Sequence, residues 1–170
     1  MSAPSFRERP EFVRGRTGEQ VVARFLQERG FYVIPSYDYS GDDGDKPPRL
    51  QGSADAFPVP DLDVARNGDR RWVEVKTKTA AIEYRKAGEL RHGINLRHLE
   101  SYRKVERETG TECWLAIYEE STGDLLAQTL TGLGEPQVGT IHGTRTAFWP
   151  RSKFQYLTTF REDATGKDAA

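Results

Sequence analysis

The stretch PDLDVARNGDRRWVEVKTK, residues 60–78, decides the fold of this 170-residue chain. Asn67 and Gly68 lie near its middle, and both residue types tolerate the positive φ angles of a two-residue hairpin turn. The strand-like runs on either side cover residues 60–66 and 69–78. We therefore predict two antiparallel strands joined by a tight turn.

Side chains alternate between the two faces of a strand, which divides residues 69–78 into two sets. Val73 and Val75 share one face, which we expect to meet the core. The other face, which we expect to be the open one, carries Trp72, Glu74, Lys76 and Lys78.

The length of the turn sets which residue lies opposite Glu74. With a two-residue loop, Arg66 pairs with Asp69, and counting outward places Asp61 opposite Glu74 on the same face. A three-residue loop would slip the register by one residue and turn Asp61 to the other face. The Asn-Gly pair favours the tighter turn, so Asp61, Glu74 and Lys76 are predicted to converge.

The preceding residues predict a helix, a strand and a loop. Thr17 with Gln20 forms a capping-box signal before apolar residues at helical spacing, and Gly30 is a suitable stop. Residues 31–35 form a short apolar run typical of a strand. Residues 40–48, rich in glycine, aspartate and proline, predict a loop.

A second helix is predicted after the hairpin. Asn95 can cap it and Gly110 can end it, and its apolar stripe contains Leu96, Leu99, Tyr102 and Val105. Residues 80–93 fit no single element. The later segments are a buried strand at 113–118, a returning strand at 125–130, a strand-like segment at 144–149 and one helical turn within 151–157. The order α-β-β-β-α-β-β predicts an α/β fold with a mixed central sheet flanked by helices.

Composition limits the classes of protein that fit. The single cysteine, Cys113, excludes an internal disulfide and a Cys-rich zinc site, and its place in an apolar run predicts a buried thiol. No apolar stretch is long enough to span a membrane and residues 1–10 lack a signal-peptide core, so we expect a cytoplasmic protein.

The net charge is −1, but residues 66–107 hold 12 Lys/Arg against 6 Asp/Glu. That cluster fits phosphate contact or, equally well, a solvated helix face.

The converging charges suit phosphodiester hydrolysis. Mg²⁺ is bound in proteins by one or two carboxylates together with waters and substrate oxygens, which Asp61 and Glu74 could provide. Lys76 could orient the attacking water or add positive charge, and between two carboxylates it should stay protonated. Glu19 lies in helical phase with the apolar residues Val22 and Leu26. A carboxylate in that position is paired or metal-bound, or else it offsets the helix dipole or frays into water.

Pro60-Asp61 followed by Glu74-Val75-Lys76 resembles the signature of the PD-(D/E)XK nucleases. The helix with Gly18-Glu19, followed by Gly30-Phe31-Tyr32-Val33, is similar to the entry of archaeal Holliday-junction resolvases and related restriction-type nucleases. The resemblance implies a restriction-endonuclease-like αβββαβ core at about 15–118, and the length of the chain, enough for one core but short for two, predicts a single domain of residues 1–160. Residues 119–160 would be a C-terminal β extension and residues 161–170 a disordered tail.

The resemblance also implies Mg²⁺-dependent cleavage of nucleic acid, with Mn²⁺ as a substitute. Asp61 and Glu74 would be metal ligands with the Val75 carbonyl, and Lys76 the catalytic lysine. Glu19 would match a helix glutamate found in many members and is a further candidate ligand.

Other residues are candidates with ordinary alternatives. His98 and Tyr102 have the spacing of a Gln-XXX-Tyr pair in recombination-exonuclease relatives, but Tyr102 also fits the apolar stripe, which favours a core role. Asp63 and Asp55 are substitute ligands. The candidate contacts to nucleic acid are Lys78, Arg85 and Lys86, although an exposed lysine at a strand end is common. His92 and His142 have no ligand-spaced partners, so a zinc site is not supported.

We expect a Mg²⁺-dependent endonuclease, with DNA preferred over RNA as substrate only by analogy of fold. The alternative is an inactive module with the same fold that binds nucleic acid or protein. A homodimer that pairs two active sites through residues from 132 onward is a third reading.

Overall fold

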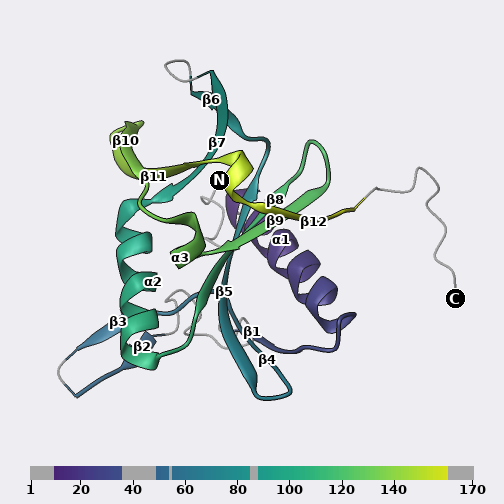
Figure 1. The fold of residues 1–170 in the computed structure, drawn as a ribbon, viewed down its shortest axis with the longest axis vertical. Coiled ribbons are helices and arrows are strands. Elements are labelled where there is room, and N and C mark those ends of the chain that lie inside the picture. The colour runs from purple at the N-terminus through teal and green to yellow at the C-terminus, as the bar shows by residue number, and fades with distance from the viewer. Residues whose placement is uncertain (1–9, 36–48, 54, 85–87, 161–170) are drawn as a thin grey trace, which may run out of the picture.

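The computed structural model describes residues 10–35, 49–53, 55–84 and 88–160. Two helices lie on opposite sides of a central sheet, and a smaller sheet stands at one end of it (Figure 1). The predicted loop at 40–48 and the predicted tail at 161–170 lie outside the described residues, as do Arg85 and Lys86. Within the described ranges, no helix is long and apolar enough to cross a membrane.

The central sheet has six strands in the order β1-β4-β5-β8-β9-β12. Neighbouring strands are antiparallel except β5 and β8, which run parallel. The strands are β1 (Tyr32–Pro35), β4 (Leu62–Arg66), β5 (Asp69–Lys78), β8 (Cys113–Glu119), β9 (Asp124–Thr129) and β12 (Gln155–Thr159). The predicted hairpin at 60–78 is thus confirmed as β4 and β5, and the strands predicted at 113–118 and 125–130 are β8 and β9.

The second sheet combines the strand predicted at 144–149 with three strands from segments to which the sequence assigned no strand. Its four antiparallel strands have the order β10-β11-β7-β6. They are β6 (Ile82–Tyr84), β7 (Glu89–Asn95), β10 (Gln137–Ile141) and β11 (Thr144–Pro150). The unassigned residues 80–93 therefore pair with part of the C-terminal extension. A separate two-stranded ribbon consists of β2 (Arg49–Gln51) and β3 (Ala56–Pro58).

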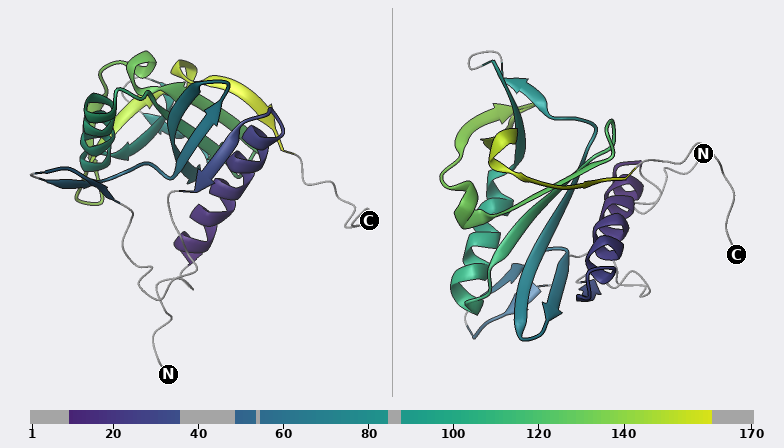
Figure 2. Two further views of the ribbon diagram at one scale, coloured as in Figure 1. Left: turned by 90° about the horizontal axis from the view of Figure 1, so that it is seen from below. Right: turned by 45° about the vertical axis from the view of Figure 1, so that its right-hand side comes forward.

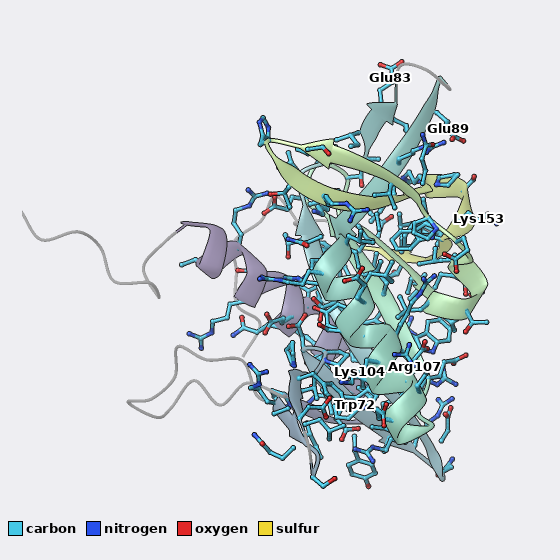
Figure 3. All side chains as sticks on the ribbon, turned by 90° about the vertical axis from the view of Figure 1, so that its left-hand side faces the viewer. Trp72, Glu83, Glu89, Lys104, Arg107 and Lys153 are labelled. Carbon is cyan, nitrogen blue, oxygen red and sulfur yellow. The ribbon has the colours of Figure 1, made fainter. Side chains whose placement is uncertain are left out.

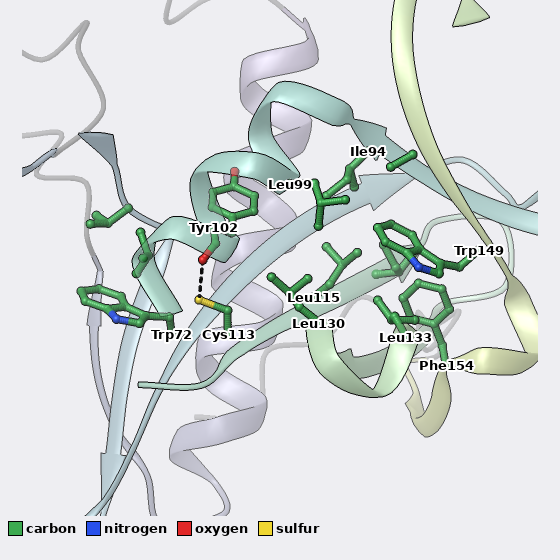
Figure 4. Packing of buried hydrophobic residues seen from close by; sticks show 14 of the residues in the cluster. Trp72, Ile94, Leu99, Tyr102, Cys113, Leu115, Leu130, Leu133, Trp149 and Phe154 are labelled. Carbon is green, nitrogen blue, oxygen red and sulfur yellow. Dashed lines mark hydrogen bonds between the residues drawn. The ribbon is translucent and has the colours of Figure 1, made fainter. Parts of the chain in front are cut away.

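Helices cover both faces of the central sheet, as the two views of Figure 2 show. On one face, α1 (Pro10–Gln27) packs Val22 and Phe25 against apolar residues of β4, β5, β8 and β9. On the other, α2 (Leu96–Thr109) and the second sheet enclose a larger apolar cluster (Figure 4). A short helix, α3 (Leu130–Leu133), adds Leu130 and Leu133 to that cluster, and Phe154, which follows the 3-10 turn η2 (Arg151–Lys153), also belongs to it.

The prediction that the first helix begins at a Thr17 cap is wrong. Helix α1 already starts at Pro10, a residue whose fixed φ suits the first helical turn. Thr17 lies inside the helix, where its hydroxyl donates to the carbonyl of Val13 at 3.1 Å. Local capping signals can therefore be overridden when the chain before them also folds as helix.

The second helix follows its prediction closely. The Asn95 side chain accepts a hydrogen bond from the Arg97 N–H at 2.9 Å, and Gly110 ends the helix with a φ of 64°. Leu99, Tyr102 and Val105 are buried. The Sγ atom of Cys113 lies 3.6 Å from the Tyr102 carbonyl (Figure 4), which confirms the buried thiol.

The charged face of β5 is not open as predicted. Glu74 is only 2% exposed and Trp72 is buried in the cluster beneath α2. The reason is topological, because β5 lies beside a parallel partner in the middle of the sheet, where both faces are covered. The functional side chains therefore sit in a partly enclosed space rather than on a surface.

A buried polar network joins the two sheets, and sequence patterns did not reveal it. The Nε2–H of His92 in β7 donates to Glu119 of β8 at 2.7 Å. Arg151 bonds the same carboxylate at 2.6 Å and Asp124 at 2.9 Å. Burial lowers the pKa of His92 despite the adjacent carboxylate, so Arg151 is the main counter-charge of Glu119.

We predict that Arg151→Met lowers the free energy of unfolding by roughly 2 to 3 kcal/mol, because it leaves the buried Glu119 carboxylate without its cation. Chemical denaturation at pH 7 measures the change. Arg145→Met is the matched control, since Arg145 is exposed on β11, and it should alter stability by less than about 0.5 kcal/mol. Equal effects of the two substitutions would contradict a structural role for the network.

Candidate active site

The β4–β5 hairpin has the register predicted for a two-residue turn. Arg66 pairs with Asp69, and the φ angles of Asn67 and Gly68 are 52° and 84°. The ladder ends at the pair of Leu62 with Val73, so the next position outward places Asp61 opposite Glu74. The structure thus brings these two carboxylates to the same side of the sheet.

Asp61 lies just before β4 and caps the ladder with its side chain. Its Oδ2 atom accepts a hydrogen bond from the Val75 N–H at 2.8 Å. The N–H and C=O of one strand residue point to the same side of the strand, so the Val75 carbonyl is directed toward the Asp61 edge as well. Asp61 is 7% exposed, so this contact is held away from bulk water.

Glu74 and Lys76 follow on the same face of β5 and form an ion pair through Glu74 Oε1 and Lys76 Nζ. The other carboxylate oxygen, Oε2, is buried and has no hydrogen-bond partner among the described residues. A buried carboxylate oxygen without a donor is costly. The site therefore has a place for a further positive or donating group.

The pKa shifts reflect the crowding of these charges. Burial, and then the charge of Glu74, raise the pKa of Asp61 well above its ordinary value. Burial opposes the charge of Lys76, but the carboxylates of Glu74 and Asp61 outweigh it and raise the pKa of the lysine. Lys76 therefore stays protonated at neutral pH, as predicted.

Glu19 reaches the same region from α1. Its charge raises the pKa of both Asp61 and Lys76, so it lies within electrostatic range of the pair. Gly18 explains the approach, because a Cβ atom there would lie 2.0 Å from Oγ1 of Thr77 in β5. A helix with any side chain at that position would stand farther from the sheet.

The predictions for α2 have separate outcomes. Tyr102 is buried in the core, as its periodicity indicated. His98 is half-buried with its ring 6.2 Å from that of Tyr102, and its Nδ1 atom is buried with no partner among the described residues. Burial, and then Lys76, lower the pKa of His98, which places the imidazole near the site. Its spacing from Tyr102 was the only sequence signal for this position.

The substitute ligands do not join the site. Asp63 forms an ion pair with Arg70 at 2.7 Å, and Asp55 pairs with Lys104 of α2. Lys78 continues the face of Glu74 and Lys76 and is half-buried rather than exposed. Asp61, Glu74, Lys76, and Glu19 at longer range, are the predicted site residues that the structure gathers.

The oxygen donors of Asp61, Glu74 and the Val75 carbonyl suit a single Mg²⁺ ion, which completes its coordination with water and substrate. They do not suit a metal that protein side chains alone must hold. Across the described residues, no three His, Cys, Asp or Glu side chains gather closely enough to hold a metal ion. Two carboxylates and a backbone carbonyl match Mg²⁺, which keeps waters and takes substrate oxygens. The unpartnered Oε2 of Glu74 and the raised pKa of Asp61 both indicate a carboxylate pair short of positive charge.

Comparison with solved structures identifies the fold. One similar structure is Hjc, a Holliday junction resolvase from the archaeal hyperthermophile Archaeoglobus fulgidus. It is 16% identical with a TM-score of 0.51, and the match covers 83% of this chain and 87% of that one. Another is D212, a nuclease from a fusselovirus, at 12% identity and a TM-score of 0.46, covering 92% and 90%. No protein-family model and no curated protein sequence matches this chain.

The chain therefore has the restriction-endonuclease-like fold predicted from its sequence, which it shares with the Hjc resolvase. The elements α1, β1, β4, β5, α2 and β8 form the αβββαβ core predicted from the sequence. At this level of identity the likeness to the resolvase concerns the fold, and the roles of individual residues rest on the geometry of the site.

We predict that Asp61→Asn raises the free energy of unfolding at pH 7, in a metal chelator, by on the order of 1 kcal/mol. The amide has no charge to desolvate, yet its oxygen still accepts from Val75. Because the pKa of Asp61 is raised in the folded state, the penalty is full above that pKa, declines as pH falls below it, and is gone below the pKa of an unfolded aspartate. The gain measured by chemical denaturation should therefore shrink toward acid pH.

Asp63→Asn is the matched control on the same strand. It breaks a partly exposed ion pair with Arg70, so it should lower stability by up to about 1 kcal/mol. The two variants are expected to shift stability in opposite directions. A loss of stability in Asp61→Asn as large as in the control would count against a strained carboxylate at position 61.

Proposed function

We propose that this protein is a metal-dependent nuclease that hydrolyses phosphodiester bonds of nucleic acid, with DNA as the preferred substrate. The observation that carries the proposal is the buried, unpartnered Oε2 of Glu74 beside Asp61 and Lys76. The fold shared with a resolvase supports the same reading. Such a carboxylate pair with a fixed ammonium is what a phosphate-cleaving site requires.

Asp61, Glu74 and the Val75 carbonyl would hold Mg²⁺, or Mn²⁺ in its place, and Glu19 is the candidate for a contact through water. When bound, the ion supplies a Lewis acid for a phosphate oxygen and lowers the pKa of a coordinated water. The hydrogen bond from Val75 fixes Asp61 at the end of β4, so this ligand is held in place before substrate arrives.

Lys76 contributes positive charge and water orientation. Its raised pKa excludes it as the group that takes a proton from water at neutral pH. Its Nζ is held by Glu74, while 27% of its side chain remains exposed, so it can contact a phosphate and the attacking water. Because α2 and the second sheet cover this face, the charge acts where water screens it weakly.

The first test combines metal binding with cleavage. We expect the wild-type protein to bind Mg²⁺ or Mn²⁺ in calorimetry and to cut at least one labelled form among duplex, single-stranded, flap and junction DNA and RNA. Glu74→Gln should lose both properties because the amide cannot provide an anionic ligand. Asp63→Asn should keep both, since its carboxylate is already paired with Arg70.

Each outcome separates the two readings of the fold. Cleavage that survives Glu74→Gln would overturn the assigned site. Nucleic-acid binding without cleavage by any metal would favour the inactive module instead. Preference for a DNA form over its RNA counterpart tests the narrower part of the proposal.

A second prediction isolates the lysine. Lys76→Gln should reduce the cleavage rate by about 10²- to 10³-fold, the usual effect of losing one electrostatic contact to the transition state. Its Mg²⁺ affinity should not fall, because the substitution removes a cation from beside the carboxylates. Loss of metal binding in this variant would show that Lys76 organises the ligands rather than the reacting phosphate.

A further inference from the structure

A hollow of about 440 Å³ lies next to Lys76, between β5 and the second sheet. Basic or histidine side chains line much of it, and none of its described lining residues is Asp or Glu. They are Lys76, Lys78, Arg91, His92, His98 and His142. A cavity of this size can hold a small molecule or one unit of a polymer, and its charge favours an anion.

The lack of a counter-charge for Lys78 among the described residues indicates that this hollow binds an anion. Lys78 is half-buried, yet no carboxylate within the described ranges forms an ion pair with it. Its register partner on β8 is Glu119, but that carboxylate is held by His92 and Arg151. Burial, and then the nearby Lys76, lower the pKa of Lys78. The folded protein thus keeps Lys78 half-buried near Lys76 without an ion-pair partner of its own in the described part of the chain, an arrangement that a bound phosphate would relieve.

The remaining wall of the hollow is apolar. Ile82 and Ile141 are 42% and 37% exposed, which is high for isoleucines that line a cavity. The ring of Phe148 also lines it, packed so closely on Gly93 that a Cβ there would lie 2.6 Å from Cδ1 of the ring. One hollow therefore combines a positive end with an apolar surface, which complements the phosphate and the base of a nucleotide.

We propose that this hollow holds one nucleotide of the substrate strand next to the phosphate cleaved at Asp61 and Glu74. Lys78 contacts the phosphate of that nucleotide, and the apolar side chains of the second sheet face its base. This inference rests on the proposed function, since Lys76 belongs to both the catalytic site and the hollow. It assigns the second sheet, which lies outside the αβββαβ core, to substrate binding.

The test compares Lys78→Ala with Lys153→Ala, which removes the same charge from the exposed turn η2 (Figure 3). Affinity for a single-stranded oligonucleotide is measured by fluorescence anisotropy over a range of salt concentrations, with a chelator to prevent cleavage. Lys78→Ala should reduce the slope of log K against log[salt] by about 0.7, the value for one lost phosphate contact, and Lys153→Ala should leave it unchanged. Equal slopes for the two variants would overturn the proposal.

A second measurement uses a probe that cannot be cleaved. In NMR spectra of the full-length protein, titration with dAMP should shift the amides of Gly93 and Phe148 in the wild type and in Lys153→Ala but much less in Lys78→Ala. Inorganic phosphate should bind through Lys78 more weakly than dAMP, because it lacks a base for the apolar wall. Amide shifts of the same size in Lys78→Ala and in the wild type would overturn the assignment.

Folding and function are separated by two readouts. The Tm of Lys78→Ala should equal or exceed that of the wild type, because the lysine has no counter-charge to lose, so weaker binding in that variant cannot come from unfolding. If the protein cleaves nucleic acid but Lys78→Ala changes neither binding nor cleavage, the nucleotide site is refuted while the proposed nuclease function stands. Binding of dAMP through Lys78 without cleavage of any nucleic acid would support the site and count against the nuclease.

Discussion

The tight turn at Asn67 and Gly68 sets the register of β4 against β5, and with it the side of the central sheet on which Asp61 lies relative to Glu74 and Lys76. Because strand residues alternate, one more residue in this turn would carry Asp61 to the α1 face, away from Glu74 and Lys76. The same register directs the Val75 N–H at the Asp61 carboxylate. A short stretch of backbone with positive φ angles therefore decides whether the acidic pair exists at all.

Charges around this hairpin fall into two groups. Asp63 with Arg70, and Asp55 with Lys104, are paired and near the surface, where such pairs have small effects on stability. Asp61, Glu74 and Lys78 are buried or half-buried and lack full compensation within the described structure. Uncompensated charges of both signs therefore lie along one face of β5. A bound metal ion would neutralise the carboxylates, and a bound phosphate would neutralise the lysine.

Local sequence signals predicted the parts of the fold that depend on neighbours in the chain. The hairpin, the capped helix α2 and the convergence of Asp61, Glu74 and Lys76 all follow from turn chemistry and periodicity. The second sheet as a whole does not, because β11, although its own segment was predicted as a strand, pairs across more than fifty residues of chain with β7, whose sequence indicated no element. Because this sheet forms between distant segments, the sequence could not predict the contact of His92 with Glu119, and it led to the expectation that β5 has an open face.

The junction of β7 with α2 has a mechanical meaning. The strand ends at Asn95 and the helix begins at Leu96, so a single residue both closes the ladder and caps the helix. No linker separates the wall of the hollow at Gly93 from the helix that carries His98. A displacement of β7 would therefore carry the first turn of α2, with His98, along with it.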